Sequence, residues 1–161
     1  MVQYYDSWIE NNEWLYIQME LCFDNLKNII EEKSKCFERQ SSEAMNSIEF
    51  YISCQLFKEL LECVQYIHGL KPPIIHRDLK PENILLNYMP TNGQFLKLCD
   101  FGLAKEHEYS QMSHTVGEGI LYYMAPEVKT PSSKTSKYTT KADVFSLGRI
   151  AEKLFDFDID S

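Results

Sequence analysis

The sequence lacks any apolar run close to the ~20 residues that a helix needs to span a bilayer. Its first residues also lack the basic and then apolar pattern of a secretory signal peptide. Basic residues are outnumbered, with 16 Lys and Arg against 24 Asp and Glu and a net charge of −8 over 161 residues. Since nucleic acids and anionic membranes attract a basic face, we expect neither to be a partner of this segment.

Cysteine pairs with metal-ligand spacing are also absent. The five cysteines are odd in number, and no two of them form a C-x-x-C pair. The four histidines are scattered along the chain as well. We therefore expect reduced thiols in a cytosolic or nuclear setting, predict a cytoplasmic location, and expect neither a zinc site nor disulfides.

The composition that remains is that of one globular domain, with 44% hydrophobic and 25% charged residues. Two strands are predicted at its beginning. Residues 15–21 alternate between apolar and polar side chains, which is the period of a strand. Residues 2–9 are aromatic and β-prone, and the polar residues 10–13 form a turn between the two strands.

Helical periodicity appears in three places. Residues 26–32 predict a short helix, followed by a charged, Ser-rich loop over 31–47. Residues 48–67 carry an apolar stripe at three- and four-residue spacing, which includes Ile48 and Ile52, while Glu49 is expected on the opposite side. Gly69 is placed to stop this helix. Residues 141–155 predict another helix, with Val144 among its buried residues.

Short apolar runs between these helices predict an antiparallel hairpin. Residues 84–87 and 95–99 form its strands, and the turn formers of 88–93 join them. Residues 100–126 show no sustained period and are expected to form an extended loop. Asn83 directly precedes the first strand and Asp100 directly follows the second, so the two should lie together. With Asp78 and Lys80 nearby, this set of side chains suits a hard cation, phosphate and a proton acceptor.

Three motifs carry a family resemblance. Residues 76–83 read HRDLKPEN, residues 100–102 read DFG, and residues 125–127 read APE. In this order they resemble the catalytic loop, the DFG motif and the APE motif of eukaryotic protein kinases. Residues 143–148, DVFSLG, resemble the start of the next buried helix of the same lobe.

The resemblance implies an α+β fold of the kinase C-terminal lobe type. This lobe is mainly α-helical, with hinge strands, a catalytic-loop β-hairpin and an N-lobe that is largely missing. Residues 1–161 would be a partial kinase domain. Within it, residues 1–22 form the end of the N-lobe and the hinge, and residues 23–161 form an incomplete C-lobe.

The resemblance also implies a role for each motif residue. Asp78 would accept the proton of the substrate hydroxyl, and Lys80 would steady the γ-phosphate of ATP. Asn83 and Asp100 would hold Mg²⁺. Arg77 would pair with a phosphorylated residue of the activation segment.

Residues 19–22 fall where the family has its hinge to the adenine of ATP. By that resemblance Met19 is the gatekeeper. Backbone groups of Glu20 and Cys22, with Leu21 between them, contact the adenine. Leu85 packs below the adenine ring. The residues themselves are ordinary strand residues, so this assignment rests on the resemblance.

A finer resemblance is to the kinases of translation initiation factor 2 alpha. Residues 4–10 (YYDSWIE), 15–22 (LYIQMELC) and 114–127 (HTVGEGILYYMAPE) carry it. It implies a protein substrate, with that factor as the candidate, and a kinase homodimer in the full-length parent. Thr115 matches the activating phosphorylation site of this group; the alternative is a solvated loop threonine.

The sequence also departs from the kinase pattern. It has no Gly-rich loop, no V-A-I-K strand and no helix to supply the partner glutamate of that lysine. Ile120 stands where a threonine usually hydrogen-bonds Asp78 and Lys80. Three hypotheses follow: a Ser/Thr kinase whose other parts lie outside this sequence, a pseudokinase-like fragment acting as an interaction module, and an incomplete gene model without a folded product.

Overall fold

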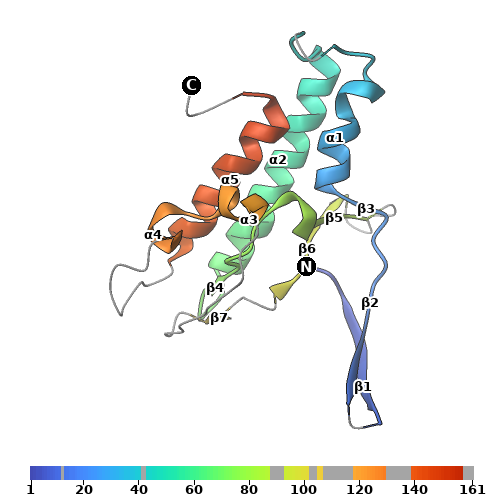
Figure 1. Cartoon of the computed structure of the whole chain (residues 1–161), viewed down its shortest axis with the longest axis vertical. Helices are drawn as coiled ribbons and strands as arrows, with labels where there is room; N and C mark the ends of the chain where they lie inside the picture. The colour runs from blue at the N-terminus through green and yellow to red at the C-terminus, as the bar shows by residue number, and fades with distance from the viewer. Residues whose placement is uncertain are drawn as a thin grey trace.

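A computed structural model of the chain describes residues 1–11, 13–40, 43–87, 93–101, 105–106, 118–129 and 139–157, with only the backbone given for 105–106 and 118–120. A two-stranded ribbon extends away from a body in which three helices lie side by side, as Figure 1 shows. Short strands and a short 3-10 helix lie at the base of these helices.

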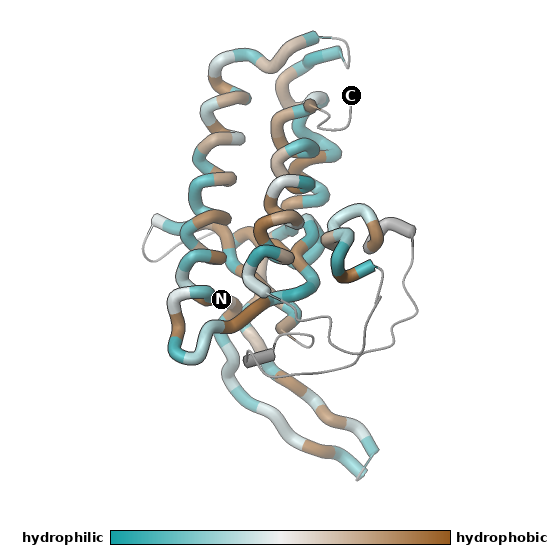
Figure 2. The backbone as a smooth tube through the Cα atoms, turned by 90° about the vertical axis from the view of Figure 1, so that its left-hand side faces the viewer, coloured by the Kyte–Doolittle hydropathy of each residue, from teal (hydrophilic) through white to brown (hydrophobic). Residues whose placement is uncertain are grey.

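The ribbon consists of β1 (Tyr4–Glu10) and β2 (Trp14–Met19), which pair antiparallel. Both predicted strands are therefore present. Trp8 stands opposite Tyr16, and their rings stack with centroids 5.4 Å apart. Every residue of both strands is exposed, and Figure 2 shows hydrophobic and hydrophilic residues interspersed along the ribbon.

The first helix, α1 (Leu26–Cys36), is longer than predicted. Asn25 caps its beginning, since its side chain accepts a hydrogen bond from the Asn28 N–H. The prediction of a loop from residue 31 was wrong because Lys33 has a buried role. Its ammonium donates to the Leu154 carbonyl at 2.7 Å, and this contact across the sequence extends the helix beyond its apolar residues.

The long helix α2 (Ser47–His68) begins and ends where expected, between the Asn46 cap and Gly69. Its buried face was predicted incorrectly in its first half. Ile48 and Ile52 are 67% and 42% exposed, whereas Glu49 is fully buried. The reason is an ion pair, because Arg39 reaches Glu49 through two nitrogens at 2.9 Å each.

The predicted hairpin is present as β5 (Ile84–Leu86) and β6 (Leu96–Leu98), with Ile84 opposite Leu98. Its loop, 88–92, lies outside the described residues. β3 (Asp24–Asn25) pairs with β5 on the other side and completes a three-stranded sheet. β4 (Ile74–Ile75) pairs with β7 (Lys105–Glu106), and the 3-10 helix η1 (Pro81–Asn83) leads into β5.

Three further helices complete the described chain: α3 (Glu118–Tyr123), α4 (Pro126–Lys129) and α5 (Thr140–Phe155). Together with β7, α3 corrects the prediction of an extended loop over residues 100–126, because elements this short show no sequence period. The prediction of α5 is confirmed, but Val144 is 57% exposed. Asp143, next to it, is fully buried instead.

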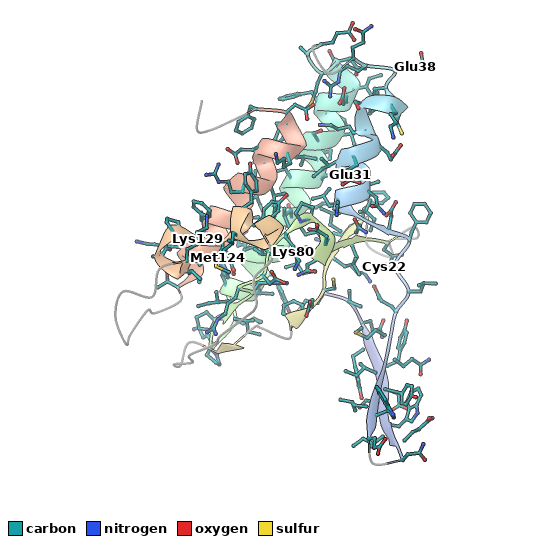
Figure 3. All side chains as sticks on the ribbon, viewed as in Figure 1. Cys22, Glu31, Glu38, Lys80, Met124 and Lys129 are labelled. Atoms are coloured by element: carbon teal, nitrogen blue, oxygen red, sulfur yellow. The ribbon has the colours of Figure 1, made fainter. Side chains whose placement is uncertain are left out.

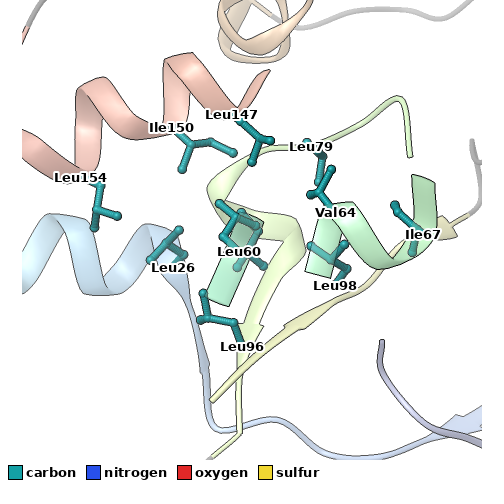
Figure 4. Packing of buried hydrophobic residues seen from close by; sticks show 11 residues of the cluster. Leu26, Leu60, Val64, Ile67, Leu79, Leu96, Leu98, Leu147, Ile150 and Leu154 are labelled. Atoms are coloured by element: carbon teal, nitrogen blue, oxygen red, sulfur yellow. The ribbon is translucent and has the colours of Figure 1, made fainter. Parts of the chain in front are cut away.

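The core joins α1, α2, α5 and the hairpin. Leu26, Leu60, Leu98 and Ile150 are at most 1% exposed, and Figure 4 shows their side chains converging from different elements. Leu79 of the HRDLKPEN segment belongs to the same cluster. The segment is therefore fixed to the centre of the domain. Among the described helices, none has the length and apolarity to cross a membrane.

Candidate active site

The backbone of the HRDLKPEN segment is held by one buried carboxylate on α5. Asp143 accepts hydrogen bonds from the backbone N–H groups of His76 and Arg77, each at 2.9 Å. It also contacts His68 Nε2 at 2.7 Å. Arg77 has a φ of +71°, a left-handed backbone conformation that residues other than glycine rarely adopt. The carboxylate therefore stabilises a strained backbone at the start of the loop.

The anchoring role of Asp143 was missed from the sequence, where the residue only marked the start of a helix. A usable signal was present, because an aspartate inside a buried stripe needs hydrogen-bond donors around it. The donors themselves lie 66 and 67 positions away in sequence.

Asp78, Lys80 and Asn83 are in direct contact. The Lys80 ammonium lies 2.8 Å from Asp78 Oδ2. The Asn83 amide nitrogen donates to the same oxygen and to the Asp78 carbonyl, both at 2.9 Å. Lys80, labelled in Figure 3, lies at the base of the helices, next to the short strands. One cation and one amide thus fix the orientation of the Asp78 carboxylate.

Asp100 is brought to the same end of the hairpin. The Cys99 N–H donates to the Asn83 carbonyl at 3.0 Å, which places Asp100 one residue from the Asn83 backbone. Asp100 has a φ of +59°, so the chain turns sharply there. His76 supports this turn, since its Nε2 lies 3.0 Å from the Cys99 carbonyl and its ring lies 4.9 Å from that of Phe101.

These side chains fit a magnesium ion that also binds phosphate. In the described part of the chain, both hydrogen bonds of the Asn83 side chain use its amide nitrogen, which leaves the amide oxygen as the metal-binding end. Among the described residues, no three His, Cys, Asp or Glu side chains are grouped to hold a metal by themselves. Mg²⁺ typically takes one or two protein oxygens and completes its shell with phosphates and water, so the set is suitable.

Burial controls the protonation of two groups at this site. It lowers the pKa of His76, even though Asp143 and the other nearby carboxylates act in the opposite direction. His76 is fully buried, and its Nδ1 has no hydrogen-bond partner in the described part of the chain. Burial also raises the pKa of the Cys99 thiol, and the charge of Asp100 adds to the effect. Both groups are therefore neutral supports of the loop.

The predicted hinge residues lie beside the hairpin. Burial disfavours the Glu20 carboxylate, but its contact with Lys97 of β6, at 2.7 Å, brings the pKa of Glu20 below its ordinary value. The Glu20 N–H donates to the Gln3 carbonyl. Its own carbonyl is then the group that can meet a base. Burial and the Glu20 charge raise the pKa of the half-buried Cys22.

The other three predicted nucleotide contacts differ in exposure. Met19 ends β2 and is 55% exposed, and Leu21 is 94% exposed. Leu85 is half-buried in β5, opposite Asn25 and Lys97. Lys97 stands opposite Leu85 in the sheet and also pairs with Glu20. Leu85, predicted to contact the adenine, is therefore close to Glu20, a predicted hinge residue.

The activation segment is described at its beginning (residues 100–101), in β7 and from residue 118 onward. Thr115 and the Ile120 side chain lie outside the described residues. Ser146 Oγ on α5 donates to the Tyr123 carbonyl at 2.7 Å, which ties α3 to α5. Burial, with the charge of Glu82 as the next cause, raises the pKa of Tyr123 to about 12. Arg77 lines a small pocket with Met124 and Asp143 near this helix.

The chain is similar to known proteins in sequence and in overall structure. The family model for the protein kinase domain matches residues 1–157. Eukaryotic translation initiation factor 2-alpha kinase 1 of Mus musculus is 35% identical over 88% of this chain and 23% of its own length. Serine/threonine-protein kinase dst2 of Dictyostelium discoideum is 36% identical over 92% of this chain and 11% of its own length.

Similarity extends to other kinase types and to a solved structure. The membrane-associated tyrosine- and threonine-specific cdc2-inhibitory kinase wee-1.3 of Caenorhabditis elegans is 34% identical over 100% of this chain and 20% of its length. The crystal structure of the yeast RNA Pol II CTD kinase CTDK-1 complex superposes with a TM-score of 0.66 at 27% identity, covering 96% of this chain and 44% of that one. The chain thus spans less than half the length of each of these proteins.

Proposed function

The chain belongs to the protein kinase family, and from this premise we propose that it takes part in transfer of the ATP γ-phosphate to a protein hydroxyl. The observation that supports the proposal most is the contact of Asp78 with both Lys80 and Asn83, next to the turn at Asp100. Positioned carboxylates, a cation and an amide are what phosphoryl transfer requires of a protein.

Asp78 is the proposed proton acceptor for the substrate hydroxyl. Its carboxylate is oriented by Asn83 and Lys80, and its backbone follows the segment that Asp143 holds. Positioning dominates catalysis of this kind, since the transition state needs little covalent chemistry from the protein. Lys80 contacts Asp78 in the described structure and is the proposed γ-phosphate contact once nucleotide is present.

Asn83 and Asp100 are the proposed magnesium ligands, and Met19, Glu20, Leu21, Cys22 and Leu85 are the proposed nucleotide contacts. Bound Mg²⁺ supplies charge neutralisation at the phosphates. The chain's own contribution is to hold the Asn83 oxygen and the Asp100 carboxylate at one end of the β5–β6 hairpin. The link between Glu20 and Lys97 connects the hinge to the same hairpin.

Specificity for serine and threonine, in a kinase of the initiation factor 2 alpha type, is the finer part of the proposal. The similarity to the mouse kinase of that factor supports it. A kinase named as tyrosine- and threonine-specific has a similar identity to this chain. The acceptor hydroxyl is therefore to be identified by phosphoamino acid analysis. A cytoplasmic location belongs to the same proposal.

The test is transfer of ³²P from γ-labelled ATP and Mg²⁺ by the full chain. Initiation factor 2 alpha and a general basic protein substrate serve as acceptors, followed by phosphoamino acid analysis. We expect labelled serine or threonine, and a loss of at least about a hundredfold in Asp78→Asn. Asp6→Asn, on the exposed ribbon, is the matched control and should keep full activity.

Equal labelling by wild type and Asp78→Asn would contradict the assignment of Asp78. Labelling of tyrosine, or of the general substrate alone, would contradict the finer proposal and leave the kinase assignment standing.

A second candidate function, non-catalytic binding of another protein, is favoured by the exposed ribbon. Trp14, Leu15 and Ile17 are 64%, 64% and 54% exposed, and large exposed apolar patches mark interaction sites. Absence of transfer together with absence of Mg²⁺–ATP binding would favour this function.

A further inference from the structure

An ion pair joins the predicted hinge to the β5–β6 hairpin. The Lys97 ammonium on β6 lies 2.5 Å from Glu20 Oε1 and 2.7 Å from Glu20 Oε2, so it contacts both carboxylate oxygens. The two side chains are 77 positions apart in sequence and are 23% and 11% exposed. The pair of Lys58 with Glu62 on α2 differs, because its side chains are 67% and 44% exposed. Solvent therefore screens the Glu20–Lys97 pair less, and its loss should have the larger effect.

The Glu20 carboxylate holds more than one side chain. Burial raises the pKa of Glu20, but the hydrogen bond and the charge of Lys97 lower it, and the net pKa is below its ordinary value. The same carboxylate accepts a hydrogen bond from Cys22 Sγ at 3.7 Å. Cys22, labelled in Figure 3, lies between the β1–β2 ribbon and the helical body. Glu20 thus joins the two residues whose backbone groups are predicted to contact adenine, and Lys97 joins both to β6.

Backbone hydrogen bonds hold the hinge segment on either side of this link. The Glu20 N–H donates to the Gln3 carbonyl at 2.9 Å, and the Phe23 N–H donates to the Leu86 carbonyl at 2.8 Å. Leu21, between these two points, is 94% exposed. The hairpin reaches this exposed stretch through the side chain of Lys97, which therefore limits how far the stretch can move from the hairpin.

The position of Lys97 is fixed by the sheet. It stands opposite Leu85 in the β5–β6 register, and residues directly opposite each other have their side chains on the same face of a sheet. Leu85 is the residue predicted to pack below the adenine ring. Asp100, a proposed magnesium ligand, follows Lys97 by three residues. One side chain thus sets the hinge backbone relative to Leu85 and to the metal-binding end of the hairpin.

We propose that Lys97 is a positioning residue for adenine, which acts through Glu20 to hold the hinge backbone at the spacing from Leu85 that a purine ring requires. The inference rests on the proposed function, because its ligand is the nucleotide of that site. Hydrogen bonds to backbone groups weaken steeply when those groups are displaced or tilted. The phosphates depend on other residues, Asn83 and Asp100 with their Mg²⁺. Loss of Lys97 should therefore affect recognition of the base and spare recognition of the phosphates.

The test compares Mg²⁺–ATP with Mg²⁺–tripolyphosphate, which has the phosphates but no base. NMR titration of the backbone amide signals of the full chain gives the dissociation constant of each ligand. In Lys97→Met we expect the affinity for Mg²⁺–ATP to fall by about fivefold or more, and that for Mg²⁺–tripolyphosphate to stay within about twofold. If Lys97 acted only by attracting anions, its loss would weaken tripolyphosphate at least as much as ATP. Lys97→Arg keeps the ion pair and should bind both ligands like wild type.

Two further variants sharpen the test. Lys58→Met is the matched control, since it removes the same charge from the exposed pair with Glu62, and both affinities should stay within about twofold of wild type. Glu20→Gln should weaken Mg²⁺–ATP as Lys97→Met does. The double variant, Glu20→Gln with Lys97→Met, should lose no more than either single variant, because both changes break one contact.

Three results would overturn the proposal: an unchanged affinity for Mg²⁺–ATP in Lys97→Met, an equal loss for both ligands, or additive losses in the double variant. Absence of Mg²⁺–ATP binding by the wild-type chain would contradict the proposed function itself, and this inference with it. The two failures are therefore distinguishable, and none of these readouts depends on phosphoryl transfer.

Discussion

The β1–β2 ribbon and the HRDLKPEN loop differ in what fixes their conformation. In the ribbon, every strand residue is exposed, and the two strands pair mainly with each other. In the loop, His76 is fully buried, Leu79 is 1% exposed and Asn83 is 7% exposed. The loop also holds a left-handed residue, Arg77, which the buried carboxylate of Asp143 stabilises from a distant helix.

This difference teaches that side chains at the candidate site depend on distant residues, whereas those of the ribbon depend on neighbours. The same chemical substitution should therefore have unequal effects in the two regions. Three of the substitutions below are paired with an exposed position, and a fourth tests the buried His76 by its pH dependence.

Asp143→Asn should have the largest effect. The buried carboxylate accepts from the N–H groups of His76 and Arg77 and contacts His68, and an amide cannot replace all three interactions. We expect a loss of about 3–5 kcal/mol in the free energy of unfolding, measured with urea. Asp6→Asn on β1 should change it by less than about 0.5 kcal/mol. Similar values at both positions would remove the contrast.

Leu60→Ala should have the next largest effect. Leu60 is fully buried in the core, so its truncation removes apolar burial and leaves a cavity, at a cost of about 2–5 kcal/mol. Leu15 on β2 is 64% exposed, and Leu15→Ala should cost less than about 1 kcal/mol. Thermal or urea unfolding of the two variants measures the difference; a larger loss at Leu15 would show that the ribbon is covered in solution.

Glu49→Gln extends the contrast to charged residues on one helix. The buried Glu49 receives two hydrogen bonds from Arg39, and loss of its charge should cost about 1–3 kcal/mol. Glu62→Gln breaks the exposed pair with Lys58 on the same helix and should cost less than about 0.5 kcal/mol. Equal unfolding midpoints for the two variants would contradict a structural role for the buried pair.

The pH dependence of stability should show the buried His76. Because burial lowers its pKa below the ordinary value of 6.5, the unfolded chain binds a proton that the folded chain does not. The contribution is therefore complete above pH 6.5 and decreases as the pH falls below that value. His76→Phe should flatten the pH dependence of the free energy of unfolding between pH 7.5 and 5.5. An unchanged slope in this variant would show that other groups cause the pH dependence.

Local patterns were enough to predict much of the fold. Alternation predicted β2, and aromatic, β-prone residues predicted β1. The apolar period predicted α2 and α5, and turn formers between apolar runs predicted the β5–β6 hairpin. The placement of Asn83 near Asp100 followed from the antiparallel pairing alone.

Contacts between distant residues account for what the sequence did not predict. Lys33 extends α1 because it reaches Leu154, and Glu49 is buried because Arg39 meets it. Such pairings have no period, so the sequence presents these residues as ordinary surface charges. The anchoring of the loop by Asp143 is of the same kind.

The central proposal is that Asn83 and Asp100 hold one divalent ion next to the Asp78 carboxylate. The most direct measurement is paramagnetic broadening of backbone amide signals by Mn²⁺ in the presence of ATP, with Mg²⁺ as the diamagnetic reference. The account predicts selective broadening at these three positions and none at Trp8 or Ile17 of the ribbon. Unbroadened signals at all three positions, or broadening spread equally over both regions, would contradict it.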